Sequence, residues 1–200
     1  MSERSSRDRL PWLQPAVLCG CLIATGSIGV RAVSGQLGAN PIATALNQLG
    51  LLGLVLLMGS LACRPLKERL HQSWSMRLRK TLGLMGFFVI LLHLLVYVVV
   101  DHGMDLRVLL DDVRERPFIL AGMTAFVLLV PLALTSTKRS MKRLGGRRWK
   151  RVHRLVYLAV PLGVVHYAMR VKADLTEPLI YGMVVALLLL ARVKVRRARS

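Results

Sequence analysis

Acidic residues and cysteines are both scarce in this 200-residue chain. It has 10 Asp and Glu against 29 Lys and Arg, and only three cysteines, Cys19, Cys21 and Cys63. Cys19 and Cys21 are two residues apart in an apolar run, so on a helix they point to different faces. The sequence therefore offers neither a disulfide framework nor a Cys-x-x-Cys metal site, and we expect all three cysteines to act as small apolar residues.

Long polar stretches are also missing, which excludes an ordinary soluble domain. Hydrophobic residues make up 54% of the chain and the mean hydropathy is +0.51. A helix that spans a bilayer needs about 20 mostly apolar residues. We therefore expect an all-α polytopic membrane protein, a six-transmembrane-helix bundle that forms one integral membrane domain over residues 1–200, with short basic tails at about 1–11 and 194–200. The predicted spans are Leu13–Val30, Ile42–Cys63, Leu82–Val100, Phe118–Thr135, Val152–Met169 and Leu179–Val193, with Pro178 or Thr176 as earlier alternative starts of the last.

The distribution of charge predicts how these helices cross the membrane. When alternate connections are assigned to opposite sides, 23 of the 29 Lys and Arg fall on the side of the two termini, and seven of the ten acids fall on the other. The positive-inside rule then places both termini in the cytoplasm. This asymmetry accounts for the net charge of +19. We therefore expect membrane lipid, and no nucleic acid, as the partner of the basic residues. On the acidic side, apolar residues at helical spacing from Leu106 to Val113 predict a surface helix.

Three histidines in or beside the apolar runs are the candidate functional residues. They are His93, inside G-F-F-V-I-L-L-H-L-L-V-Y, and His153 and His166, near the two ends of W-K-R-V-H-R-L-V-Y-L-A-V-P-L-G-V-V-H-Y-A-M-R. An ionisable side chain in a bilayer costs roughly 2.5–3.5 kcal/mol and so indicates a function. A neutral imidazole is a ready ligand for haem iron.

The depths of these histidines predict which of them act together. At the α-helical rise, His93 lies about 16 Å from the start of its helix, and His166 lies about 20 Å beyond His153. The two helices run in the same direction, so His93 and His166 reach a similar depth, as the two axial ligands of one haem must. His153 falls on a different face from His166 unless Pro161 kinks the helix, and we expect it to mark a second, inner position.

The two remaining histidines are not expected to bind a cofactor. His71 lies in a basic connection and is expected to be exposed to solvent. His102 lies in a loop on the acidic side and is flanked by acids.

Four segments of the sequence carry a resemblance to a known family. They are R-K-T-L-G-L-M-G-F-F-V-I-L-L-H-L-L-V-Y, R-P-F-I-L-A-G, L-A-L-T-S-T-K-R-S-M-K-R-L-G-G-R-R-W-K-R-V-H-R-L-V-Y-L and V-V-H-Y-A-M-R-V-K. They resemble the ferric-reductase-like transmembrane family, and within it the haem-binding membrane subunits of periplasmic methionine sulfoxide reductase systems. The resemblance runs from about Leu37 to Arg192.

The resemblance implies a function, cofactors, partners and a location. The implied cofactors are haem b and FMN, in a multi-pass protein of the bacterial inner membrane. Electrons would come from a cytoplasmic flavin reductase or the quinone pool. They would leave to a periplasmic molybdopterin-containing subunit that reduces methionine sulfoxide in oxidised proteins. The haem histidines of the family fall on His93, His153 and His166, so these are the expected cofactor-binding and metal-binding residues, and no catalytic residue is expected.

The sequence departs from the family at two places. Larger relatives hold two haems with two histidine pairs, but the inner partner on the third helix would fall near Arg79 or Lys80, so a second bis-histidine haem is not expected. The stretch N-Q-L-G at Asn47–Gly50 lacks a histidine that is often found there in the family and keeps only the glycine.

Basic residues near the helix ends provide further expectations. The segments Arg77–Lys80 and Arg147–Arg151 would hold the phosphate of FMN or, as an alternative, anchor the protein in anionic lipid. Arg170 and Lys172 would pair with the haem propionates.

Other functions also fit a membrane bundle with histidines. They are a cytochrome b subunit of another oxidoreductase, a ferric reductase without its soluble domain, a small transporter with a histidine proton relay, and a structural assembly factor. The lack of paired acids within the helices and of an inverted repeat argues against the transporter.

Overall fold

The structure is a bundle of long helices that run side by side. The computed structural model describes residues 11–171 and 174–197, and every regular element in these residues is helical, which confirms the predicted all-α class. The helices are α1 (Leu13–Val33), α2 (Pro41–Arg69), α3 (Ser75–Leu95), α4 (Leu106–Glu115), α5 (Pro117–Leu134), α6 (Lys138–Val152), α7 (Val156–Arg170) and α8 (Thr176–Arg197), with a π-helical turn at Val96–Asp101 and a 3-10 turn at His153–Leu155.

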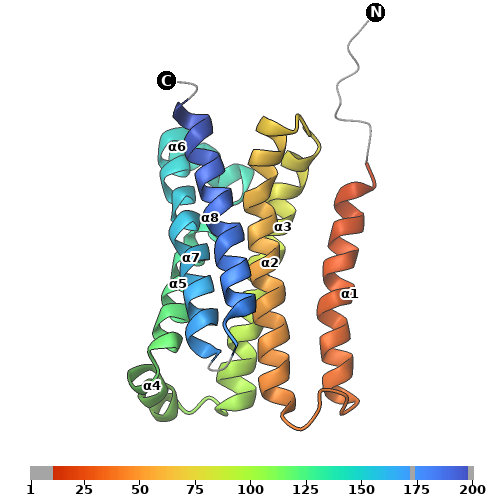
Figure 1. The fold of residues 1–200 in the computed structure, drawn as a ribbon, viewed down its shortest axis with the longest axis vertical. Coiled ribbons are helices and arrows are strands. Elements are labelled where there is room, and N and C mark those ends of the chain that lie inside the picture. Colours follow the sequence, from red (N-terminus) through yellow and green to blue (C-terminus); the bar gives the residue numbers. More distant parts are fainter. Residues whose placement is uncertain (1–10, 172–173, 198–200) are drawn as a thin grey trace, which may run out of the picture.

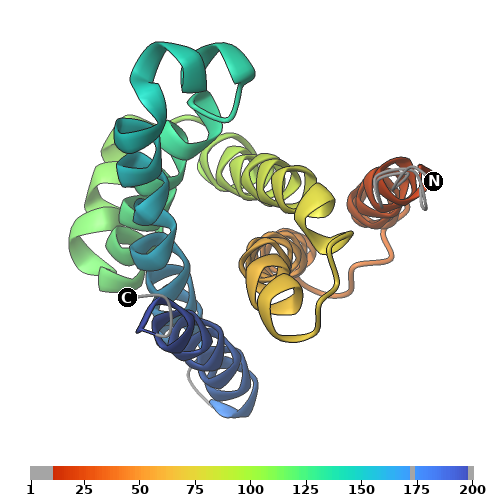
Figure 2. The ribbon, with the colours of Figure 1, turned by 90° about the horizontal axis from the view of Figure 1, so that it is seen from above.

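Two helix pairs form the centre of the bundle. The most extensive contacts are between α2 and α3 and between α5 and α7. Figure 2 shows these pairs from above, with α8 against α7 and α2, and α1 on the outside beside α2 and α3. In Figure 1, α4 lies at one end of the bundle, and the start of α1 and the end of α8 both lie at the other. The central cluster of buried residues comprises Leu54, Leu57, Met58, Leu61, Leu129, Ala159, Val160, Val164 and Val185.

Local signals set the starts of several helices. The Asn40 side chain accepts a backbone hydrogen bond at the start of α2, and Pro41 occupies the first position of that helix. Pro117 begins α5 in the same way. The Asp105 side chain accepts two backbone hydrogen bonds at the start of α4, and α4 confirms the predicted surface helix.

The helices α2 and α3 extend furthest beyond the ranges expected from hydropathy. The second span was expected to end at Cys63, but α2 continues through Pro65 to Arg69, and α3 already begins at Ser75. Charged residues at the end of a membrane helix can stay helical while their long side chains reach polar surroundings, so hydropathy places the boundary too early.

The predicted fifth span, Val152–Met169, is not one continuous helix. The 3-10 turn that begins at His153 separates α6 from α7. Hydropathy missed α6 because most of its residues are basic or polar, and Gly145 (φ 70°) interrupts it. Pro161 lies inside α7.

The described residues contain five helical stretches long and apolar enough to cross a membrane. They are Leu13–Val33, Pro41–Arg69, Ser75–Asp101, Pro117–Leu134 and Lys138–Arg170, which indicates a multi-pass membrane protein. The sixth predicted span corresponds to α8, which begins at the earlier alternative start, Thr176, and packs against α2 and α7. That α8 crosses the membrane stays a prediction.

Glycines allow α2 and α3 to pack closely. A Cβ at Gly53 would lie 2.5 Å from Cδ1 of Ile90, and a Cβ at Gly86 would lie 2.9 Å from Cγ and 3.2 Å from the backbone nitrogen of Leu57. Helices in lipid associate through this kind of close van der Waals contact between small residues. The contact fixes α3, and with it His93, relative to α2.

We expect Gly86→Val to destabilise the bundle by about 1–3 kcal/mol, because the added methyl groups meet both the side chain and the backbone of Leu57. Gly29→Val on α1 is the matched control, since a Cβ there meets nothing within 4 Å. Thermal unfolding of the two variants in the same detergent checks this. Equal midpoints for both variants would contradict the packing argument.

Candidate cofactor site

The structure brings two of the three predicted histidines together. His93 on α3 and His166 on α7 have ring centroids 6.3 Å apart, with the ring planes 85° to each other. Both rings line one cavity between the helices. The similar depth predicted for the two side chains is therefore observed.

A hydrogen bond to the backbone of a neighbouring helix holds each ring. Nδ1 of His93 lies 2.9 Å from the carbonyl oxygen of Leu46 on α2, and Nδ1 of His166 lies 2.6 Å from that of Phe118 on α5. A carbonyl oxygen only accepts, so Nδ1 carries the proton in both rings and donates it. Nε2 of each neutral ring then has a lone pair available for a metal ion.

Each of these hydrogen bonds depends on a glycine four residues after the accepting carbonyl. A Cβ at Gly50 would lie 3.3 Å from Nδ1 of His93, and a Cβ at Gly122 would lie 2.7 Å from Nδ1 of His166. In an α-helix a carbonyl oxygen points toward the residue four positions later. A side chain at that residue would therefore occupy the space of the ring. The same arrangement is built twice, once between α2 and α3 and once between α5 and α7.

The cavity around the two imidazoles has a volume of about 310 Å³ and mostly apolar walls from α2, α3, α5 and α7. Apart from the histidines, the polar residues that line it are Asn47, Tyr97, Asp101, Arg116, Tyr167 and Arg170. Arg170 is thus in place for its predicted role, whereas Lys172 lies outside the described residues.

The geometry fits a flat metal-containing group between the rings. Two nitrogen–metal bonds of about 2 Å on opposite sides of a metal would separate the ring centroids by roughly 6 Å, and the observed separation is 6.3 Å. Within the described residues, no group of three or more His, Cys, Asp or Glu could hold a metal ion. His93 and His166 could therefore supply two axial ligands to a metal whose other ligands belong to the bound group, as in haem.

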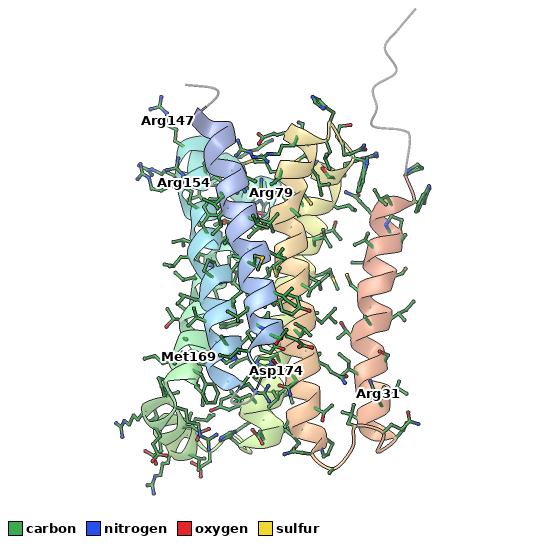
Figure 3. All side chains as sticks on the ribbon, viewed as in Figure 1. Arg31, Arg79, Arg147, Arg154, Met169 and Asp174 are labelled. Carbon is green, nitrogen blue, oxygen red and sulfur yellow. The ribbon has the colours of Figure 1, made fainter. Side chains whose placement is uncertain are left out.

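His153 lies apart from this pair, in a second cavity. This cavity has a volume of about 350 Å³ and is also lined by Arg79, which Figure 3 places at the same end of the bundle as Arg154. Nε2 of His153 lies 3.1 Å from the Thr135 hydroxyl, and its ring stacks on Trp149 with centroids 4.0 Å apart. His153 therefore occupies a separate position, as predicted.

The second cavity, which we call the basic cavity, is lined by three cationic side chains and one imidazole of the described residues. Arg79, Lys80 and Lys138 line it together with His153. Among the described residues that line it, His153 is the one histidine. Of the basic segment 147–151, Trp149 is the residue that lines this cavity.

The other two histidines line neither cavity. His71 is exposed and has a positive φ of 54° in the connection between α2 and α3. His102 lies 3.0 Å from the Asp112 carboxylate through Nε2 and 3.1 Å from the Tyr97 carbonyl oxygen through Nδ1. Both were predicted to be outside the cofactor site.

Sequence reasoning missed four contributors to the site. Three of them, Arg116, Phe118 and Gly122, lie in R-P-F-I-L-A-G. The fourth, Gly50, lies in N-Q-L-G. The signal in the sequence was a glycine inside an apolar span, because it leaves space for a histidine ring from a neighbouring helix. Nothing in a single sequence says which span faces which.

Comparison with known proteins gives the family. The model for the ferric reductase like transmembrane component matches residues 44–164, a range that contains His93 and His153 and ends just before His166. A relative from Rhodospirillum rubrum is 46% identical over 201 residues, which cover 100% of this chain and 96% of the relative. A relative from Deinococcus radiodurans is 46% identical over 185 residues, which cover 92% of this chain and 90% of the relative.

A third relative, from Caulobacter vibrioides, is 43% identical over 198 residues, which cover 96% of this chain and 94% of the relative. All three relatives are named protein-methionine-sulfoxide reductase heme-binding subunit MsrQ. The similarity extends over nearly the full length of each of them. The chain therefore belongs to the ferric-reductase-like transmembrane family and, within it, to the MsrQ subunits.

Proposed function

We propose that this chain is a haem b subunit that passes electrons across the bacterial inner membrane to a periplasmic molybdopterin-containing methionine sulfoxide reductase. The donor would be a cytoplasmic flavin reductase or the quinone pool. The observation that carries the proposal is the pair of imidazoles, His93 and His166, each with an unprotonated Nε2 in one cavity. The names of the relatives support it. When bound, haem would supply a one-electron carrier.

The residues of the chain would orient and tune this carrier. The hydrogen bonds from Nδ1 to the backbone carbonyl oxygens fix the orientations of the two rings. They also make each Nε2 a stronger ligand for the metal. The apolar walls keep water away and lower the local dielectric, which changes the relative stability of the two redox states. The close approach at Gly50 and Gly122 leaves the rings little freedom to turn.

The proposed orientation puts the basic end of the bundle in the cytoplasm. In Figure 3, Arg79, Arg147 and Arg154 lie at one end and Asp174 lies at the other. The start of α1 and the end of α8 both lie at the basic end, which suits six crossings with α8 as the last. His166 would then lie near the periplasmic side, since α7 ends only four positions later, at Arg170.

The basic cavity would be the inner cofactor position marked by His153. For FMN, the phosphate would lie against Arg79, Lys80 and Lys138, and Trp149 would offer an aromatic face to the ring system. An anionic lipid headgroup could use the same three cations.

His93→Ala and His166→Ala should each abolish the low-spin spectrum of a bis-histidine haem, because one axial ligand is lost. His71→Ala should leave it unchanged. Reduced-minus-oxidised spectra of the purified proteins test this, and an intact spectrum in either of the first two variants would refute the ligand assignment.

Reduced wild-type protein should also be reoxidised by a periplasmic methionine sulfoxide reductase subunit given methionine sulfoxide, and no reoxidation would count against the proposed electron acceptor.

A haem-to-protein ratio tests the role of His153. If His153 helps to hold a second haem, the wild type should bind two per chain and His153→Ala about one, with the His93–His166 spectrum retained. If both proteins bind one haem per chain, FMN is the proposed occupant of the basic cavity. Flavin fluorescence after denaturation measures the FMN content. One haem and no flavin would rule out an inner cofactor.

Alanine substitutions of glycines should weaken haem binding in a graded order. Gly122→Ala should have the larger effect, because its Cβ would lie 2.7 Å from Nδ1 of His166, and Gly50→Ala the smaller, at 3.3 Å from His93. Gly59→Ala on α2 is the control, since Gly59 lines neither cavity and its Cβ would meet Leu82 at an ordinary 3.5 Å. Haem content after identical purification gives the order, and equal content in all three variants would contradict the role of the glycines.

A further inference from the structure

A buried carboxylate joins three side chains at the α4 end of the bundle. Asp112 on α4 is only 8% exposed. Its Oδ2 accepts a hydrogen bond from the Tyr97 hydroxyl at 3.0 Å and lies 3.0 Å from Nε2 of His102, and its Oδ1 lies 3.3 Å from Nε of Arg116. Burial of a carboxylate is costly unless polar partners compensate it. These contacts supply the partners and fix α4 against the π-helical turn at the end of α3.

The network also fixes Arg116 at the cavity. Arg116 is the one residue between the end of α4 at Glu115 and the start of α5 at Pro117, so its backbone has little freedom. The contact with Asp112 involves Nε, whereas a guanidinium has five N–H donors in all. The side chain is 55% exposed and lines the cavity that contains the two imidazoles.

A second arginine lines the same cavity from another helix. Arg170 is the last residue of α7, and no carboxylate of the described residues lies within the 4.0 Å of an ion pair from it. Of the described carboxylates, only Asp101 lines the cavity, and it lies 3.6 Å from Nδ1 of His102. Two cations and one carboxylate thus border a cavity whose other walls are mostly apolar.

We propose that Arg116, held by Asp112, forms with Arg170 a clamp for the two propionate carboxylates of the haem between His93 and His166. The inference rests on the proposed function. Carboxylates at the edge of an apolar cavity need cationic partners, and guanidinium groups bind them in a bidentate geometry that an ammonium group cannot match. The clamp assigns a cofactor contact to the α4–α5 connection, outside the four helices that form the walls.

Substitution of Arg116 should change the redox behaviour while both axial ligands remain. In Arg116→Gln the midpoint potential of the haem should fall, because an unpaired carboxylate disfavours the more negative reduced state. The potential should also become pH-dependent near neutrality, rising as the pH falls, because an unpaired propionate can take up a proton on reduction. Arg116→Lys keeps the charge and should restore most of the potential. The matched control is Arg114→Gln, two residues earlier on α4, whose side chain is 77% exposed and lies 3.7 Å from Asp111.

The outcomes separate this inference from the proposed function. A wild type without a bis-histidine spectrum would refute the proposed function itself. A normal wild type with an unchanged potential and pH profile in Arg116→Gln would overturn the clamp. If Arg116→Gln binds haem too weakly for a redox titration, the reconstituted variant should transfer haem to apomyoglobin faster than Arg116→Lys and Arg114→Gln do, and equal rates would overturn the clamp. If Arg116→Gln fails to fold by circular dichroism, Arg170→Gln provides the same potential and pH test.

A double-mutant cycle tests Asp112 as a positioning residue. Loss of the Asp112 charge alone should raise the potential by the same amount whether or not Arg116 is present. If Asp112 orients Arg116, the shift caused by Asp112→Asn should be smaller in the wild-type background than in Arg116→Gln. Equal shifts in the two backgrounds would overturn the positioning role.

Discussion

The hydrogen bond from an imidazole Nδ1 to a helix carbonyl is the interaction on which the site depends. It determines which nitrogen of His93 and of His166 carries the proton, and it leaves the other nitrogen as a ligand. It requires a glycine beside the ring, and that glycine allows the two helices to come close enough for the hydrogen bond. Tautomer, helix spacing and ring orientation are therefore consequences of a single contact that is made twice.

The duplicated contact divides the site between two structural units. The pair α2–α3 orients His93 within itself, and the pair α5–α7 orients His166 within itself. Each pair can thus prepare one ligand before the two pairs meet. The cofactor would then join the pairs, since neither has both ligands, and its binding free energy would add to that of the assembled bundle.

The parts of this structure that could be predicted from sequence are those that depend on local composition and spacing. The apolar runs predicted the helices, and the helical rise predicted that His93 and His166 lie at a similar depth. The boundaries of α2 and the existence of α6 were missed because charged residues can be helical at a membrane surface. The glycine contacts were missed for another reason. Gly122 matters because α5 faces α7, and this is a property of the assembled bundle that no single segment contains.

Apolar side chains separate the two cavities, and this partition affects how the protein could use the membrane potential. Leu57 and Leu129 line both cavities, and Phe87 of the basic cavity stacks on Phe126 of the other with centroids 5.7 Å apart. A buried water molecule needs polar partners, and these four side chains offer none, so we expect no chain of water molecules to cross between the two cavities. In the proposed orientation, the membrane potential favours outward movement of an electron by about 2.3 kcal/mol per 100 mV, because the inside of the cell is negative. The dry partition would let the cell use that voltage for reduction in the periplasm without a proton leak through the same protein.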